Sequence, residues 1–267
     1  MRLRDVFHRG AGLLVAVAAI GFGPTPALAD RDGGKSKPSP VIVKAKSSTF
    51  VGAAGDCGTG YPAGSRIVTA RWVNGLGLPD NNGANVGIDP TDNPNKGDPH
   101  SGLLLSKNGT TPDCSAAQVV IQSVTGMTVT ATFALGFDFR NGGHCGAGAP
   151  RFNVDTDMGF FFVGCANAPQ SPAPQDALQW TRTRSVLTTC GVECFPGPIP
   201  VGAKINSINI TFDEGTDTAN NDTQGIGLAV LDNIFINGVT ITDGGGASIG
   251  AGESESDRKG PTGERPW

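Results

Sequence analysis

The stretch MTVTATFALGFDFR, residues 127–140, decides the fold class. Large apolar side chains stand at every second position from Met127 to Phe139, and small or polar residues stand between them. Such a period of two puts the large apolar groups on one face of an extended strand. We therefore predict a single strand over the whole segment, with its apolar face in a core.

Shorter segments with the same alternation occur on both sides of this stretch, and no window shows a sustained helical period. We predict further strands at 66–73, 117–124, 159–163, 178–187 and 205–212. A break in the alternation at Ile205 predicts a bulge near Asn206. Asn237-Gly238, between two β-branched runs, predicts a two-residue type I′ hairpin over 234–241.

The composition fits such a chain, because 40 glycines, 19 prolines and only 6% aromatic residues are typical of a turn-rich β protein. We predict an all-β fold for residues 47–242, a two-sheet antiparallel β-sandwich that is jelly-roll-like and disulfide-stapled. The long polar loops at 78–101 and 165–176 are where such a fold usually carries its function.

Both ends of the chain differ from this middle part. Residues 1–29 combine arginines, an apolar run and a small-residue pattern that ends at Ala29, the three parts of a secretory signal peptide. We predict cleavage near Ala29 and a secreted protein, extracellular or periplasmic, without a membrane span, since the run is shorter than the roughly 20 residues that cross a bilayer. We expect a flexible N-terminal segment at 30–46 and a disordered C-terminal tail at 243–267.

Six cysteines follow the signal peptide, and an even number in an exported chain is typical of disulfides rather than of a zinc site. A hairpin turning near Thr156 would bring Cys145 close to Cys165, so we predict that pair from the strand geometry. The other two predicted disulfides follow by elimination: Cys190 with Cys194, and Cys57 with Cys114.

The charge of the central span limits the function classes. Residues 47–241 carry nine Lys or Arg and sixteen Asp or Glu, a net charge of −7, so we expect no binding of nucleic acid. His100 and His144, the two histidines after the signal peptide, stand in no recognisable nucleophile motif. A glycosidase needs two carboxylates across a cleft, and the span has only two glutamates, Glu193 and Glu214.

The segment INSINITFDEGTDTANNDTQGIGLAVLDNIFING, residues 205–238, resembles the C-terminal strands of secreted bacterial jelly-roll domains, and CGAGAPRFNV, residues 145–154, resembles a segment of uncharacterised secreted bacterial proteins. The chain is thereby distantly similar to carbohydrate-binding modules. In such modules the aspartate of the closing strand often ligates a structural calcium ion, which the resemblance assigns to Asp232.

The alternation within 230–236 also turns Asp232 toward the core side, where an unpaired carboxylate is costly. Either a calcium ion with Asp213 or Glu214 as co-ligand, or hydrogen bonds from loop amides, would compensate its charge. Both interpretations remain open at this point.

Carbohydrate recognition needs an exposed aromatic ring with polar side chains nearby, and the candidates are Tyr61 and Trp180. Trp72 shares its alternation with Val68 and Ala70, which indicates the core instead. We expect an exported, non-catalytic binding or surface-associated structural module, with carbohydrate or cell-surface material as its partner. The alternatives are a carbohydrate-active hydrolase or lyase on the same fold, and an adhesion or matrix component.

Overall fold

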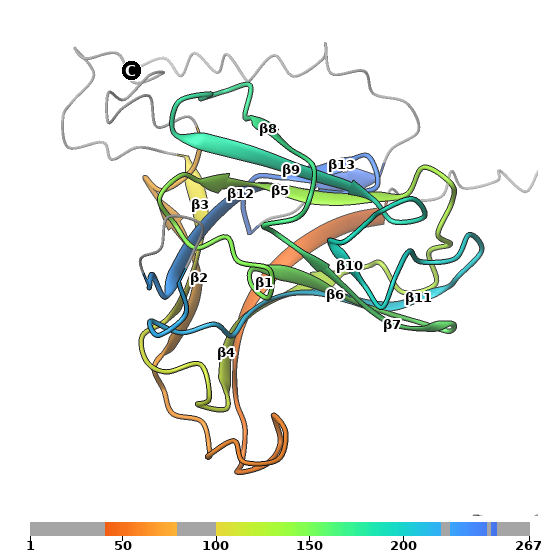
Figure 1. Cartoon of the computed structure of the whole chain (residues 1–267). Helices are drawn as coiled ribbons and strands as arrows, with labels where there is room; N and C mark the ends of the chain where they lie inside the picture. The colour runs from red at the N-terminus through yellow and green to blue at the C-terminus, as the bar shows by residue number, and fades with distance from the viewer. Residues whose placement is uncertain (1–40, 79–99, 220–224, 245–246, 250–267) are drawn as a thin grey trace, which may run out of the picture. The chain divides into compact units, whose positions relative to one another are not determined.

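The structure is a computed structural model that describes residues 41–78, 100–219, 225–244 and 247–249 (Figure 1). All regular elements within these ranges are β-strands. The strands are β1 (Val41–Val51), β2 (Val68–Asn74), β3 (Ser101–Lys107), β4 (Ser115–Gln122), β5 (Ala134–Arg140), β6 (Arg151–Thr156), β7 (Gly159–Gly164), β8 (Gln170–Pro172), β9 (Trp180–Val186), β10 (Cys194–Phe195), β11 (Ile205–Phe212), β12 (Leu228–Ile236), β13 (Val239–Ile241) and β14 (Ala247–Ile249).

The strands form two antiparallel sheets, which Figure 1 shows as two layers. The first sheet has the order β10-β7-β6-β11-β4-β1-β14, and the second has the order β2-β3-β12-β5-β9-β8 with β13 beside β12. Four strands of each, β4-β11-β6-β7 and β3-β12-β5-β9, follow the strand order of a jelly roll. The predicted fold class is therefore confirmed.

The main core lies between the two sheets. Phe152 of the first sheet packs against Phe137 of the second, with ring centroids 5.5 Å apart. Alternate residues of β11, including Ile208 and Ile210, are fully buried there. Side chains of a strand point alternately to its two faces, so the residues between the buried ones face outward. On β6, Asn153 lies between the buried Phe152 and Val154 and faces outward from the first sheet.

The long strand predicted for 127–140 was wrong in its first half. Val129 exchanges backbone hydrogen bonds with residues 202–203 beside the first sheet, and a turn closed by Phe133 N–H to Thr130 C=O then carries the chain to the second sheet. The strand begins only at Ala134. Val129 and Phe133 are both fully buried, because the apolar alternation continues through the turn between the two sheets.

The structure also corrects the expected ends of the domain. β1 begins at Val41, inside the segment expected to be flexible, and its Val43 and Ala45 side chains are fully buried. β14 lies in the expected tail and pairs with the start of β1. The predicted signal peptide, residues 79–99 of the polar loop and residues 250–267 lie outside the described residues.

Several local predictions are confirmed. β11 has the predicted bounds, and its register with β6 shifts between Ile205 and Ser207, where the bulge was expected. Asn237 and Gly238 both have positive φ in the β12–β13 hairpin, as a type I′ turn requires. All three predicted disulfides are present: Cys57–Cys114, Cys145–Cys165 and Cys190–Cys194. In the described ranges the structure has no helix long and apolar enough to span a bilayer.

Candidate functional site

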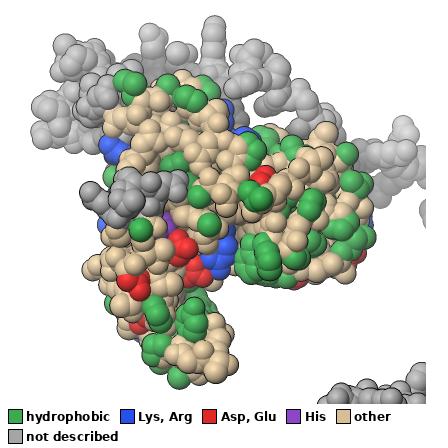
Figure 2. Space-filling model, in the orientation of Figure 1, with side chains coloured by type: hydrophobic (Ala, Val, Ile, Leu, Met, Phe, Trp, Pro, Cys, Tyr) green, Lys and Arg blue, Asp and Glu red, His purple; other side chains and the backbone are tan. Residues whose placement is uncertain are grey.

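A cleft of about 350 Å³ opens on the outward face of the first sheet, where loop 52–65 folds over the start of β4. Figure 2 shows acidic and basic side chains meeting in a hollow between two parts of the surface, with hydrophobic side chains on either side. The cleft is lined by Phe50, Cys57, Tyr61, Lys107, Thr111, Asp113, Ser115, Ala116, Gln118, Gly148, Arg151, Asn153, Thr211, Asp213 and Glu214.

Arg151, the first residue of β6, organises one side of the cleft. Its guanidinium donates two hydrogen bonds to Asp213, 2.6 and 2.8 Å long, and another to Asn153 Oδ1 at 3.0 Å. The guanidinium also lies over the Phe162 ring, 5.2 Å from its centroid. This two-pronged pairing fixes the plane of the guanidinium and neutralises its charge within the protein.

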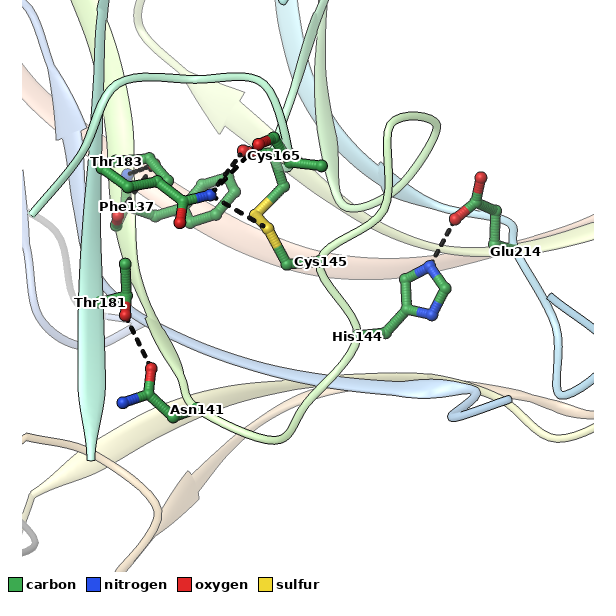
Figure 3. Close-up of a disulfide and its surroundings, with 10 residues drawn as sticks. Phe137, Asn141, His144, Cys145, Cys165, Thr181, Thr183 and Glu214 are labelled. Atoms are coloured by element: carbon green, nitrogen blue, oxygen red, sulfur yellow. Dashed lines mark hydrogen bonds and ion pairs between the residues drawn. A yellow bond between two sulfur atoms is a disulfide. The ribbon is translucent and has the colours of Figure 1, made fainter. Parts of the chain in front are cut away.

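Glu214, next to Asp213 after β11, is held by His144 from the β5–β6 loop (Figure 3). His144 is fully buried, its Nε2 pairs with Glu214 Oε2, and its Nδ1 has no hydrogen-bond partner. The tautomer with its proton on Nε2 fits this site, because a proton on Nδ1 would be a buried N–H without an acceptor. Nε2 then donates to the carboxylate, whose side chain keeps 18% of its surface exposed.

Two glycines of the same loop allow this close approach. A Cβ atom on Gly146 would lie 2.4 Å from Glu214 Oε2, and one on Gly148 would lie 2.3 Å from Oε1. Any larger residue would push the carboxylate away. The neighbouring Cys145–Cys165 disulfide fixes the start of the loop (Figure 3), so the position of Glu214 depends on a cross-linked backbone.

Lys107, at the end of β3, contributes a buried cation to the cleft. Its Nζ donates hydrogen bonds to the backbone carbonyls of Thr111 and Asp113, at 2.9 and 2.6 Å. Burial lowers the pKa of Lys107, and the neighbouring carboxylates, Asp213 first, offset part of that effect. The ammonium group thereby holds loop 108–114 in place, as a bound cation would.

The opposite wall of the cleft is loop 52–65, which carries Tyr61. The Cys57–Cys114 disulfide ties it to the body, and Asp113 accepts hydrogen bonds from Ser65 N and Ser65 Oγ, at 3.2 and 2.7 Å. Burial raises the pKa of Asp113, but the hydrogen bonds from Ser115 and Ser65 outweigh this and lower it overall. Tyr61 is 37% exposed, so its ring is accessible to a ligand.

The structure places Tyr61, Asp213 and Glu214 at the cleft, but the predicted surface position of Trp180 was wrong. Trp180 is fully buried in a small second core on the outward face of the second sheet, with Leu78, Ala173 and Val230. Loop 173–179 covers it there, so it offers no surface for a ligand.

Asp232 also lies on that outward face, and its predicted orientation toward the main core was wrong. A register shift after Asp232, with Asn233 at a φ of 45°, turns Ile234 to the opposite side from Val230. The Asp232 carboxylate accepts hydrogen bonds from the backbone N–H groups of Leu78 and Asn233. One loop amide and one amide of β12 therefore offset part of the cost of its burial, close to one of the two sequence interpretations.

Asp232 and its two alternative calcium co-ligands, Asp213 and Glu214, have different partners. Asp232 binds backbone amides, Asp213 binds Arg151, and Glu214 binds His144. No group of three or more His, Cys, Asp or Glu side chains is arranged to hold a metal ion in the part of the chain that the structure describes. Calcium binding stays a prediction.

Sequence reasoning missed the roles of Arg151, Asn153 and His144. The segment RFNVD at 151–155 has the alternation of a half-buried strand, which could have placed Arg151 and Asn153 together on an outward face. The pairing of His144 with Glu214 joins two loops far apart in the sequence and leaves no local signal. Comparisons of the chain with protein families, curated proteins and solved structures gave no match.

Proposed function

We propose that this protein is an exported, non-catalytic binding module and that the cleft on its first sheet binds carbohydrate. The observation that carries the proposal is the mixture of groups in the cleft: Glu214 and Gln118 offer hydrogen-bond acceptors and donors beside the exposed ring of Tyr61. Sugars present hydroxyl groups, which both donate and accept, together with apolar C–H faces that pack on aromatic rings.

The charges of the cleft favour an uncharged sugar. Lys107 and Arg151 face three carboxylates, Asp113, Asp213 and Glu214, so the lining is slightly acidic. Both cations already donate to protein oxygens. A uronate or sulfate group would therefore meet unpaired negative charge without a free cation to bind it.

Rigidity of the site supports a binding function as well. Asn153 and Thr211 lie on neighbouring strands and are joined by an Asn153 Nδ2 to Thr211 Oγ1 hydrogen bond of 2.9 Å. Disulfides fix the loops on both sides of them. A surface ordered before binding loses less entropy when the ligand arrives, which favours affinity.

A carbohydrate-active hydrolase or lyase is the second candidate, because three carboxylates line one cleft. Against it, Asp213 is engaged by Arg151 and Asp113 by two serines. Glu193, the other glutamate considered from the sequence, accepts a hydrogen bond from Gly191 N in the Cys190–Cys194 loop. Among the described residues, Glu214 thus has no evident second carboxylate of the kind that glycoside hydrolysis requires.

Affinity electrophoresis of the purified protein through gels containing β-glucan, xylan, galactomannan or polygalacturonate tests the proposal. We expect at least one neutral polysaccharide to retard the protein, and Tyr61→Ala and Glu214→Gln each to weaken that binding about tenfold. Leu178→Ala, an exposed apolar position outside the cleft, is the control.

Absence of retardation by every polysaccharide would overturn the proposal, as would retardation that the cleft variants do not change. Release of reducing sugar ends by the wild type, lost in Glu214→Gln, would establish the hydrolase instead. Unsaturated products lost in the same variant would establish a lyase.

A further inference from the structure

A strip of exposed phenylalanines lies beside the cleft on the outward face of the first sheet. Phe160 on β7 and Phe195 on β10 are 47% and 67% exposed, and Phe162 lies between them with centroid distances of 5.1 and 6.3 Å. Fully solvated aromatic rings are unfavourable, and contiguous exposed apolar groups commonly mark a binding surface. We call these three residues the phenylalanine strip.

The strip continues directly into the cleft. Phe162 stands opposite Asn153 in the β6–β7 pairing and also contacts the Arg151 guanidinium, and both of those residues line the cleft. Thr211 on β11 stands opposite Arg151, and Gln118 on β4 stands opposite Thr211, so these two residues continue the row. Since neighbouring strands lie about 4.8 Å apart, the three steps from β7 to β4 cover about 14 Å.

No unpaired charge lies between Phe162 and Gln118 in this row, although Asp155 stands opposite Phe160 at the far end of the strip. Asn153, Thr211 and Gln118 are uncharged, and the one charged member, Arg151, is paired with Asp213 through two hydrogen bonds. Amide and hydroxyl groups thus adjoin the aromatic rings along a path longer than one sugar ring. A protein interface usually has a continuous apolar core, and here polar groups border the apolar strip directly. A glycan instead needs polar and apolar groups side by side.

We infer that the binding surface extends from the cleft to the phenylalanine strip and that its ligand is an uncharged polysaccharide chain lying across β4, β11, β6, β7 and β10. Phe160 and Phe195 support its sugar rings, and Glu214 and Tyr61 hold its end in the cleft. This inference rests on the proposed function, and it adds the length and charge of the ligand and a second set of contact residues.

The test is the double variant Phe160→Ala/Phe195→Ala, assayed on the neutral polysaccharide that retards the wild type and on oligosaccharides of the same sugar. Both rings are exposed, so the variant should keep the wild-type melting temperature. We expect at least a tenfold loss of affinity for the polysaccharide, and loss of the gain in affinity that the wild type shows as the oligosaccharide lengthens. Leu178→Ala should match the wild type in both measurements.

Equal polysaccharide affinity of the double variant and Leu178→Ala would refute the extended surface. The proposed function would survive that result if Tyr61→Ala and Glu214→Gln still weakened binding, so the two failures are distinguishable. Sedimentation velocity tests whether the strip is instead a protein interface. If the wild type self-associates, and the double variant abolishes this self-association but leaves glycan binding unchanged, the strip is a protein interface and the inference is overturned.

Discussion

The pH dependence of folding offers a direct test of the environment of Asp232. This carboxyl is 3% exposed, and burial, followed by the nearby Asp138 and Asp243, raises its pKa to about 7, although hydrogen bonds from Leu78 and Asn233 work in the opposite direction. In the unfolded chain the same group has its ordinary value of 3.8. Between these two values the folded protein retains a proton that the unfolded chain has already released.

Stability must therefore fall as the pH rises through this window. The free energy of unfolding changes by about 1.4 kcal/mol per pH unit for each proton of difference, so a shift of about three units amounts to about 4 kcal/mol. The contribution of Asp232 is full below pH 3.8, declines from there to about pH 7, and is lost above it. The pKa values of Asp113 and Asp217 are lowered, so these two groups make the free energy of unfolding rise with pH. They do so only below their ordinary value of 3.8.

Urea unfolding of the wild type and Asp232→Asn at half-unit intervals from pH 4 to pH 8 measures this effect. The amide cannot ionise, so the variant should lack the decline, and the difference between the two free energies should change by about 4 kcal/mol across the range. Parallel curves for the two proteins would show that Asp232 is ionised in the folded state throughout, and would refute the reasoning.

Three further predictions concern the cleft. Gly148→Ala should displace Glu214, because the new Cβ would lie 2.3 Å from its Oε1; we expect about tenfold weaker glycan binding, measured by affinity electrophoresis, at a cost of about 1–3 kcal/mol in urea unfolding. Lys107→Met should leave the Thr111 carbonyl without its donor and the Asp113 carbonyl with Ser115 N–H alone, and should lower the free energy of unfolding by about 1–3 kcal/mol. Mild reduction should cleave Cys57–Cys114 before the other two disulfides, since Cys57 alone among the six cysteines is exposed. Thiol mapping should detect the two free cysteines, and glycan binding should fall before the circular dichroism spectrum changes.

The sequence was most informative where local pattern and tertiary structure agree. Alternation over 205–212 predicted β11 with its bulge, and Asn237-Gly238 predicted the hairpin that closes β12. The Cys145–Cys165 disulfide followed from the β6–β7 hairpin, because a hairpin fixes which flanking residues meet. Each of these features depends on a few neighbouring residues.

Side-chain environments depend on layers that alternation alone does not contain. Trp180 was expected at the surface, but it is buried in a second apolar cluster with Leu78, Ala173 and Val230. At Asp232 a single residue in left-handed conformation, Asn233, inverts the alternation within the strand. To predict that the Trp180 and Asp232 side chains are buried, one would need to know which loops fold back over the sheet.

The cleft itself was not predictable as a unit, since its parts come from four distant segments, 50–61, 107–118, 148–153 and 211–214. Asp213 and Glu214 were selected from the sequence as calcium ligands, yet their partners, Arg151 and His144, lie about 60 to 70 positions away. Only the strand order β6-β11-β4 brings these segments together. Selection of carboxylates by type thus found two residues that line the cleft, and their role as calcium ligands stays a prediction.

The three disulfides explain how such a surface can be held rigid. Loop 52–65 is exposed over almost its whole length, so it gains little from apolar burial, and Cys57–Cys114 anchors it instead. Cys145–Cys165 fixes the glycine-containing loop under Glu214, and Cys190–Cys194 fixes the turn that presents Phe195. Every cross-link thus supports a segment of the proposed binding surface. Because a preordered surface loses less entropy on binding, this placement favours recognition of a ligand that itself brings only hydroxyl groups and weak stacking contacts.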